Sequence, residues 1–571
     1  MGAQSVFATF TRAGLLALSL TACSRCNKER KEETALPVEA PVAVPSALLA
    51  DIVIPSPNAT WKKLQGTVGG AVGILPTTAG GIVCALLGFD PGVADEIDGS
   101  LPAYGVVAGD PTAASFVFAM KLVDVRHART ALLEGETARF NPRESPGMTE
   151  LVAKNSLTAP RGAAAITRGG YLLLASRSQD LVDFGPYAAR TLPSRPPPTD
   201  GAVVVDVPRS AIADQIAPKL SAQWLNAKTF LLSEDERARK DHGGRVPDYG
   251  DPKVIVAALD GVLSKRIAVV SDLESVHVAL NVTDDGITAV TTLTPVSASG
   301  AASAWANGMH LGDAAPLLEL PLESSLAVLA RDDAETSALD LETVATSSPR
   351  LDDAGKARVH EIAGDVSKAR GDWIAAAVSW DDTRTAFLRL PVRDADAADR
   401  AARGVTELLR VTPFKDVFHV RDVIAGTQDL AGIGKLSVAE ILPTERTDQP
   451  RPKGDAGARR GPHKLAAGWR VADGQLTVAL GEDAAPAYRA GALPPKKLAD
   501  EHAVTEPIAA VGPFISTLVV AQPLRLDPKR ASLPAAPLVV VLGQKEKRAF
   551  VRLSVASGLL REAARGQIPG L

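Results

Sequence analysis

The chain contains few of the residues that most often indicate an activity. Its 571 residues include three cysteines and eight histidines, and aromatic residues make up only 4%. A low aromatic content argues against a surface that stacks sugar rings or nucleobases. Basic and acidic residues are nearly balanced, 62 against 66, which gives a net charge of −4. Nucleic acid is therefore not expected as a partner, because proteins that bind this polyanion usually carry a basic excess or stripe.

Motifs of known catalytic chemistry are also missing. The Gly-x-Ser-x-Gly turn of α/β hydrolases does not occur. Serine lies beside glycine at Ser299 and Ser557, but there we expect it to cap the start of a helix. The nearest approach to a phosphate-binding loop ends at Gly434-Lys435, where Asp429 replaces the first glycine and Leu436 the magnesium-binding serine or threonine. We expect no catalytic residue and no cofactor.

Candidate metal ligands do not show the spacing that a metal site requires. His360 and Glu361 begin like the helix of a zinc protease, but Gly364 stands where the second histidine should be. A further polar group, whose spacing specifies no metal, comprises Asp241, His242, Asp248 and Asp251. Two carboxylate pairs, at 352–353 and 381–382, are expected in turns, where aspartate forms local hydrogen bonds. We expect no metal site.

What the sequence does contain is a short motif near its N-terminus. An apolar run from Ala13 to Leu20 follows Arg12, and the run ends in Leu20-Thr21-Ala22-Cys23. It is too short to cross a bilayer, which takes roughly 20 apolar residues. Small residues before a cysteine at this place resemble the lipobox of bacterial lipoproteins. The resemblance implies a signal peptide at residues 1–22, cleavage between Ala22 and Cys23, and acylation of Cys23.

The same resemblance implies a location in the cell for the chain. A protein acylated at Cys23 is held on the bacterial cell envelope by its lipid anchor, and several acyl chains together give stable attachment. Ser24 is not the aspartate associated with retention in the inner membrane, so the resemblance points to the outer membrane. Residues 23–45 are predicted to be the lipidated cysteine and a tether, because Pro37, Pro41 and Pro45 favour an extended, semi-rigid chain.

Acylation of Cys23 leaves two cysteines to explain. Cys26 and Cys84 are able to form a disulfide in the oxidising envelope. Cys84 lies in an apolar stretch, however, and we expect it to be a small buried hydrophobic side chain.

Beyond residue 100 the chain alternates short strands, turns and helices. Ala163 to Ala175 turns at Gly169-Gly170, and Val276 to Leu293 turns at Asp284-Asp285-Gly286. Both patterns are typical of β-hairpins, which pair their strands antiparallel. The predicted fold class is therefore α+β, with hairpin-built antiparallel sheets and helices packed on one face.

Landmarks recur in the second part of the chain. A hairpin followed by Pro186-Tyr187 is matched by one followed by Pro486 and Tyr488, and Ala-Ser-Gly follows a hairpin at 298–300 and again at 556–558. We therefore predict an internal duplication that gives two related α+β halves, at 46–312 and 313–571. A repeat of this length indicates two domains and not a solenoid.

Three stretches have less regular patterns. Residues 46–100 are predicted to be helical, and in their most apolar part, Gly66 to Gly88, Pro76 and several glycines favour two short buried helices over a membrane span. Residues 233–251 are charged and are expected to form an exposed loop. The basic segment at 447–463 is expected to be a solvated loop, with contact to an anionic partner as the alternative.

These features favour a lipid-anchored envelope protein with a non-catalytic role, which scaffolds or binds an envelope protein or a lipid. One alternative is a carrier or chaperone for an apolar ligand such as a lipid, with Gly66 to Gly88 as its support. A second alternative is an unrecognised hydrolase that uses dispersed residues around His242.

Overall fold

The computed structural model describes residues 39–134, 138–154, 162–241, 243, 251–331, 341–380, 384–444, 465–526 and 535–565. Outside them lie the predicted signal peptide, Ala22, Cys23, Cys26, the carboxylate pair at 381–382 and the loop at 447–463. The chain forms two compact units. Unit 1 comprises Met1–Leu220, Val270–Ala302 and Arg552–Leu571, and unit 2 comprises Ser221–Val269 and Ser303–Val551.

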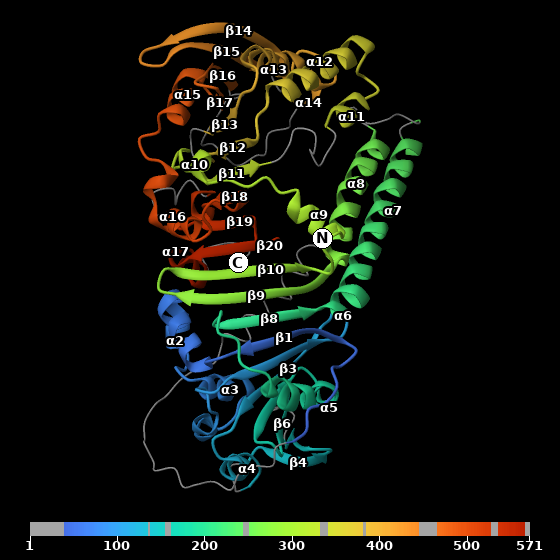
Figure 1. Ribbon diagram of the computed structural model, residues 1–571, viewed down its shortest axis with the longest axis vertical. Helices are drawn as coiled ribbons and strands as arrows, with labels where there is room; N and C mark the ends of the chain where they lie inside the picture. The colour runs from blue at the N-terminus through green and yellow to red at the C-terminus, as the bar shows by residue number, and fades with distance from the viewer. Residues whose placement is uncertain are drawn as a thin grey trace, which may run out of the picture. The chain divides into compact units, whose positions relative to one another are not determined.

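Both units mix helices with antiparallel strands, as predicted (Figure 1). The strands of unit 1 are β1 (Leu48–Ile54), β2 (Ala103–Ala108), β3 (Ser115–Lys121), β4 (Phe140–Ser145), β5 (Met148–Ala153), β6 (Ala163–Thr167), β7 (Tyr171–Ala175), β8 (Val203–Pro208), β9 (Leu273–Thr283) and β10 (Gly286–Pro295). Their order across the sheet is β4-β5-β6-β7-β3-β2-β1-β8-β9-β10.

The strands of unit 2 are β11 (Leu326–Arg331), β12 (Trp373–Val378), β13 (Ala386–Pro391), β14 (Val420–Leu430), β15 (Gly434–Pro443), β16 (Leu465–Ala472), β17 (Gln475–Gly481), β18 (Ile515–Ala521), β19 (Leu538–Lys545) and β20 (Arg548–Ala556), the last of which belongs to unit 2 up to Val551. Their order is β14-β15-β16-β17-β13-β12-β11-β18-β19-β20. Each position in this order is ten strands later in the chain than its counterpart in unit 1.

Helices connect these strands. Those of unit 1 are α2 (Pro57–Val68), α3 (Ala79–Leu87), α4 (Val125–Leu133), α5 (Ser178–Pro186), α6 (Arg209–Ala211) and α17 (Ser557–Ala564), with short turns η1 (Gly70–Ile74), η2 (Pro91–Glu96), η4 (Tyr187–Thr191), η5 (Leu192–Ser194) and η6 (Ile212–Ile216). Those wholly or mostly in unit 2 are α7 (Ala217–Asp241), α8 (Pro252–Ser271), α9 (Ala301–Asn307), α10 (Ala315–Leu318), α11 (Leu341–Thr346), α12 (Asp353–Ala369), α13 (Ala395–Leu408), α14 (Phe414–Val417), α15 (Ala484–Ala492) and α16 (His502–Ala509), with η8 (Leu498–Asp500) and η9 (Pro523–Leu526). None of the helices within the described ranges is both long and apolar enough to cross a bilayer.

The sheet of unit 1 is covered on both faces. On one face Val106 packs with Leu181 of α5 and Tyr187 of η4. On the other face Trp61 of α2 packs with Val282 of β9. The expectation of helices on one face is therefore wrong for this unit. Both faces are covered because strands such as β2, whose six residues are all buried, need packing partners on both sides.

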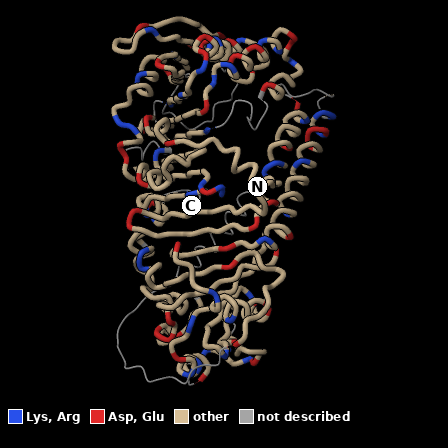
Figure 2. The backbone as a smooth tube through the Cα atoms, viewed as in Figure 1, with Lys and Arg blue, Asp and Glu red and all other residues tan. Residues whose placement is uncertain are grey.

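Unit 2 follows the same rule. Ala479 of β17 packs with Tyr488 of α15 on one face. Trp469 of β16 packs with Ala397 of α13 on the other, because Trp469 neighbours Gly468, the residue opposite Ala479, and successive residues alternate between faces. Charged residues lie mainly in helices and connecting loops, whereas the strands contain fewer of them (Figure 2).

The local sequence signals had mixed success. The hairpins β6–β7 and β9–β10 are confirmed. Two short helical segments, η1 and α3, do lie within 66–88, but the prediction that both are buried is wrong for η1, where Ile74 is 87% exposed. The prediction that residues 46–100 are helical is wrong at Leu48–Ile54, which form β1. The loop predicted from residue 233 is wrong up to Asp241, because α7 continues to that residue.

Residues 39–45, the last part of the predicted tether, lie in contact with unit 1. The backbone N–H of Val42 donates to Thr191 Oγ1 at 2.9 Å, and the Thr191 hydroxyl is also 2.8 Å from the Val42 carbonyl. Glu39 is paired with Arg190 at 3.0 Å. This segment is therefore held at both its backbone and its carboxylate.

The start of α13 provides a stability test. The Asp394 side chain accepts a hydrogen bond from the backbone N–H of Ala397 at 3.0 Å, which caps the helix. Asp394→Ala should lower the stability of α13 by about 1 kcal/mol, since the N–H loses its acceptor. Asp394→Asn keeps an acceptor and should lower the stability by only about a few tenths of a kcal/mol. Hydrogen–deuterium exchange of α13 peptides measures the effect, and equal exchange in the two variants would contradict the assignment.

Candidate functional site

Three neighbouring strands of unit 1 align polar side chains across one sheet face. Asp51 of β1 lies opposite Asp206 of β8, and Asp206 lies opposite His277 of β9. Residues directly opposite each other share a face and have neighbouring side chains. We call Asp51, Asp206 and His277, together with their partners Tyr187, Arg195 and Asp200, the acid–histidine row.

The Asp51 end of the row is buried. Asp51 is 8% exposed, and its Oδ2 accepts hydrogen bonds from Arg195 Nη1 at 2.8 Å and from the Tyr187 hydroxyl at 3.1 Å. Arg195 Nη2 also donates to the Tyr187 oxygen at 2.8 Å. Burial raises the pKa of the Asp51 carboxyl, against the opposing effect of Arg195, and raises the pKa of Tyr187 to about 12. The tyrosine is therefore a neutral donor at ordinary pH.

The His277 end of the row is half-buried and differs in chemistry. His277 Nδ1 lies 2.6 Å from Asp206 Oδ1, and Nε2 lies 2.7 Å from Asp200 Oδ2. Carboxylates only accept hydrogen bonds, so both contacts are satisfied when the ring is protonated. Burial, the largest single effect, lowers the pKa of His277, but the bonds to Asp206 and then Asp200 together raise it above its ordinary value.

This geometry disfavours catalysis by His277. A general base needs a ring nitrogen that is free to take a proton from a substrate. Both nitrogens here are occupied by carboxylates that stabilise the protonated ring. The row instead links strands β1, β8 and β9 through fixed charges.

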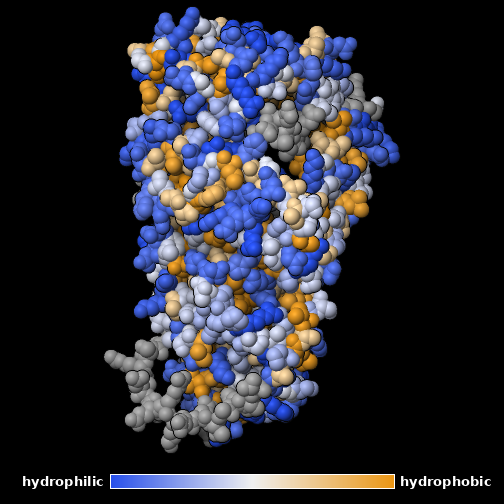
Figure 3. All heavy atoms as spheres, viewed as in Figure 1, coloured by the Kyte–Doolittle hydropathy of each residue, from blue (hydrophilic) through white to orange (hydrophobic). Residues whose placement is uncertain are grey.

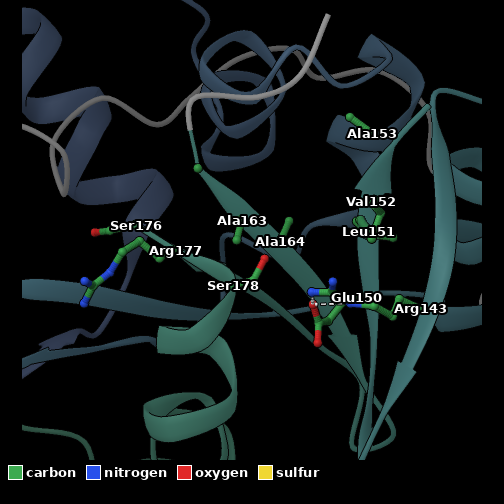
Figure 4. Close-up of a pocket in the computed structure, with 11 residues that line it drawn as sticks. Arg143, Glu150, Leu151, Val152, Ala153, Ala163, Ala164, Ser176, Arg177 and Ser178 are labelled. Atoms are coloured by element: carbon green, nitrogen blue, oxygen red, sulfur yellow. Dashed lines mark hydrogen bonds and ion pairs between the residues drawn. The ribbon is translucent and has the colours of Figure 1, made fainter. Parts of the chain in front are cut away.

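A pocket of about 470 Å³ opens where strands β5 and β6 separate (Figure 4). Their pairing ends at Glu150 and Ala165, and the strands diverge beyond that point. The pocket is lined by Arg143, Glu150, Leu151, Val152, Ala153, Gly162, Ala163, Ala164, Ser176, Arg177 and Ser178. Arg143 and Glu150 point toward each other on one side, and Ser178 and the two alanines lie between them and Arg177.

The charges of this pocket compensate one another. Glu150 is 4% exposed and receives Arg143 Nε at 3.0 Å and the Ser145 hydroxyl at 2.6 Å. Arg177 donates to both oxygens of Asp180, at 3.1 and 2.8 Å. Each of the two lining arginines therefore already has a carboxylate partner, which weakens an interpretation of the pocket as an anion site.

Helices α7 and α8, which connect β8 to β9, form what we call the helical arm. They run side by side (Figure 1) and are joined through Asp260, whose two oxygens accept from Trp224 Nε1 and Lys228 Nζ, each at 2.7 Å. Large apolar side chains of α7 remain exposed, namely Leu225 at 62%, Phe230 at 63% and Leu231 at 43%.

Helix α8 combines many apolar residues with Lys253, Asp260, Lys265 and Arg266, and most of its apolar side chains are half-buried. Figure 3 shows hydrophobic and hydrophilic side chains intermixed over this part of the surface. The exposed large apolar side chains of the helical arm therefore lie on α7, at Leu225, Phe230 and Leu231.

Of the polar group of Asp241, His242, Asp248 and Asp251 singled out from the sequence, Asp251 is the one whose side chain the structure describes. Asp251 accepts from Arg239 Nη2 at 2.7 Å and from the backbone N–H of Lys253 at 2.9 Å. Asp241 ends α7, while His242 and Asp248 lie outside the described residues. The predicted group therefore stays a prediction. Within it, the Asp251 carboxylate is already engaged by hydrogen bonds at the start of α8.

The remaining motif residues have structural roles. His360 Nδ1 lies 2.6 Å from Glu342, and Glu361 pairs with Arg358 at 2.6 Å. Asp352 caps α12 by accepting from the Gly355 N–H at 2.7 Å, as expected for a carboxylate with local hydrogen bonds.

The phosphate-loop and serine interpretations are also resolved. Gly432 to Leu436 turns from β14 into β15, so no helix follows to bind a phosphate. The predicted serine cap is wrong at Ser557, because Ala556 occupies the cap position and no side chain bonds there. Cys84 is buried and unbonded, as expected, and burial raises its pKa to about 12.

Sequence reasoning missed the acid–histidine row. A signal was present, since Asp206 interrupts a continuous run of valines and His277 lies between two valines. Such a residue is placed on one sheet face by the two-residue period. The sequence does not give the register that brings together residues 71 positions apart.

Comparison with known proteins identified no relative. No protein-family model, no curated protein and no solved structure matches the chain.

The row makes a prediction about pH. Because the pKa of folded His277 is raised, its contribution to stability is complete below the ordinary histidine pKa and is lost as pH rises through the raised value. The melting temperature of unit 1 should therefore fall as pH increases from about 6.5. His277→Gln should flatten this slope, and Asp200→Asn or Asp206→Asn should reduce it. Calorimetry across neutral pH tests this, and an unchanged slope in His277→Gln would refute it.

Proposed function

We propose that the chain is a lipid-anchored protein of the bacterial cell envelope, in the outer membrane, which binds a protein partner through the helical arm and has no catalytic role. The observation that supports it is the exposure of Leu225, Phe230 and Leu231 on α7. The lipobox-like segment ending at Cys23 supports the anchor. Exposed apolar patches rimmed by polar residues are typical of interaction sites.

The composition of the helical arm favours a protein over a lipid as its partner. Lys228, which lies between Leu225 and Phe230 on α7, is paired with Asp260 at 2.7 Å. Apolar anchors with a polar rim of satisfied charges are the usual anatomy of a protein interface. A lipid surface offers no directional partners for such fixed pairs of opposite sign.

The carrier alternative has lost its sequence support. Residues 66–88, on which it rested, contribute Ile82 to a packed cluster with Trp61 and Val282. The pocket between β5 and β6 is lined by ion-paired arginines and does not suit an acyl chain. The hydrolase alternative, which rests on His242, stays a prediction because that residue lies outside the described residues. His277 does not supply it with a free base, since both of its ring nitrogens are engaged.

We also propose that the two halves, 46–312 and 313–571, arose by duplication. The strand orders correspond position by position. Each strand from β1 to β10 corresponds to the strand ten later in the chain, β11 to β20. Asp124 and Asp394 cap the helices that follow β3 and β13 with nearly equal backbone angles, φ −133° in both and ψ 110° and 108°. A Tyr-x-Ala-x-x-Leu-Pro segment begins at Tyr187 and again at Tyr488.

Equivalent hydrogen bonds join equivalent places in the two units. Beyond β3, the Leu122 N–H donates to the carbonyl of Gly170 at 2.9 Å; beyond β13, the Val392 N–H donates to the carbonyl of Gly474 at 2.8 Å. Both glycines lie in the turn of the adjacent hairpin, β6–β7 or β16–β17. Shared order, caps and hairpin contacts support common descent more strongly than any one landmark.

The anchor is tested by metabolic labelling. Cells that express the full chain should incorporate labelled palmitate into it, and Cys23→Ser should abolish incorporation, because it removes the thiol that the lipobox-like motif places for acylation. Cys84→Ser is the matched control, since that thiol is buried and should not take part. Incorporation that survives Cys23→Ser would overturn the anchor.

The helical arm is tested by site-specific photocrosslinking in intact cells. A crosslinking residue at Leu225 or Phe230 should capture one envelope protein, whereas the same residue at Leu493, which is equally exposed at 63%, should not. With the captured protein purified, Leu225→Ser with Phe230→Ser should weaken binding by about tenfold or more, as expected when interface anchors are truncated. Equal capture at Leu493, or unchanged affinity, would contradict the proposal.

A further inference from the structure

The segment between α2 and α3 carries a second exposed apolar feature. Around it the segment is well packed, since Trp61 and Ile82 are buried against β9. At the break between the helices, however, Ile74 is 87% exposed and Leu75 is 41% exposed. We call residues 69–76 the Ile74 loop. Ile74 is the most exposed of the large apolar side chains in the described residues.

The Ile74 loop is held in place by hydrogen bonds from α2. Gln65 Nε2 donates to the carbonyls of Val72, Leu75 and Pro76 at 3.1, 3.0 and 3.2 Å. Trp61 Nε1 donates to the Pro76 carbonyl at 3.1 Å. Because one side chain fixes three carbonyls, the exposure of Ile74 belongs to a defined conformation and not to a fraying end.

Backbone angles agree with this conformation. Gly69 and Gly70 have φ values of 63° and 58°, in the left-handed region that glycine enters at little cost. The chain leaves α2 by this double glycine and turns outward. Two glycines and one glutamine therefore hold the loop in a conformation that exposes the Ile74 side chain.

The surroundings of the Ile74 loop carry positive charge. From Ile52 to Phe89 there is no acidic residue, and both charges in that stretch, Lys62 and Lys63, are exposed on α2. Helix α17 lies beside α2 and η1, with Arg561 Nε donating to the Thr67 carbonyl at 3.1 Å. Acidic groups also lie on neighbouring elements, namely Asp284 and Asp285 in the β9–β10 turn and Glu562, which pairs with Arg565 at 2.6 Å.

From this arrangement we propose that the Ile74 loop is a membrane contact, which inserts Ile74 and Leu75 into the surface of a bilayer containing anionic phospholipid. Apolar side chains beside lysines are the features of interfacial membrane binding. The occupant is a lipid surface because the nearest helix supplies Lys62 and Lys63, which form no ion pair within the described parts of the chain. Its place in the cell rests on the proposed lipid anchor, but the contact itself does not require acylation.

A tether makes a weak contact of this kind effective. Two apolar side chains alone give modest affinity, but a chain already attached at Cys23 meets the bilayer at high local concentration. Fifteen residues separate Cys23 from Glu39, where the described chain begins. The Ile74 loop would then fix how unit 1 faces the membrane, which a tether alone leaves open.

The experiment uses the full chain with Cys23→Ser and Cys26→Ser, so that it carries no acyl group. Thr77→Cys places a reactive thiol on an exposed residue beside the loop, and Cys84 stays unlabelled because it is buried and its pKa is raised to about 12. An environment-sensitive fluorophore at 77 should shift to the blue when vesicles of phosphatidylcholine and phosphatidylglycerol are added. A fluorophore introduced by Leu493→Cys is the control for a site in unit 2.

The decisive comparison adds Ile74→Ser with Leu75→Ser, which leave the fold intact because both side chains are exposed. The concentration of vesicles needed for half of the shift at 77 should rise about tenfold or more. No shift at 77, an equal shift at 493, or an unchanged concentration dependence in the double variant would each overturn the proposal. A shift at 77 that depends on protein concentration without vesicles would assign the loop to a second copy instead.

Failure of this test is distinguishable from failure of the proposed function. The vesicle assay uses a chain that lacks the anchor, so palmitate labelling and crosslinking at Phe230 are read independently of it. If the shift occurs only without phosphatidylglycerol, the anionic part of the proposal is wrong.

Discussion

The register of β1 is the constraint on which the arrangement of unit 1 depends. This strand pairs with β2 and β8, and all but one of its residues are buried. A slip of one residue would move every side chain to the opposite face. Asp51 would then leave Tyr187 and Arg195 and lie among apolar side chains, where an unpaired carboxylate is strongly unfavourable. The single polar residue of β1 therefore also helps to specify its pairing.

Because its charged groups are paired with one another and Asp51 is buried, we interpret the acid–histidine row as a structural element of the sheet. Taking Asp51 out of water is unfavourable, and Arg195 and the Tyr187 hydroxyl offset part of that cost. At the other end, two carboxylates stabilise one protonated histidine. Asp51 Oδ2, the Tyr187 hydroxyl and both ring nitrogens of His277 are each engaged by a neighbour in the row, while Asp51 Oδ1 is buried without a hydrogen-bond partner among the described residues. The proposed contacts lie instead where large apolar side chains are exposed, at Phe230 and at Ile74.

The sequence predicted those parts of the fold whose cause is local. The β6–β7 hairpin follows from Gly170, whose φ of 78° requires glycine, between two apolar runs. Strand β1 was missed because Asp51 interrupts its apolar run and its partner Asp206 lies far along the chain. The β14–β15 hairpin was missed because most of β14 is exposed, so no alternation of apolar residues marks it. For the same reason the candidate sites could not be predicted: exposure of Phe230 depends on which faces other elements leave uncovered.

The two exposed apolar surfaces differ in a way that separates their partners. On the helical arm, Lys228, which lies between Leu225 and Phe230 in the chain, is already bound to Asp260. Such a fixed pair suits a protein surface, which can align complementary groups. Near Ile74 the lysines of α2 have no acidic residue in the surrounding segment, and their field remains available to anionic headgroups. Similar apolar exposure therefore leads to different proposals, because the lysine beside Phe230 is paired with an aspartate, whereas no acidic residue lies between Ile52 and Phe89.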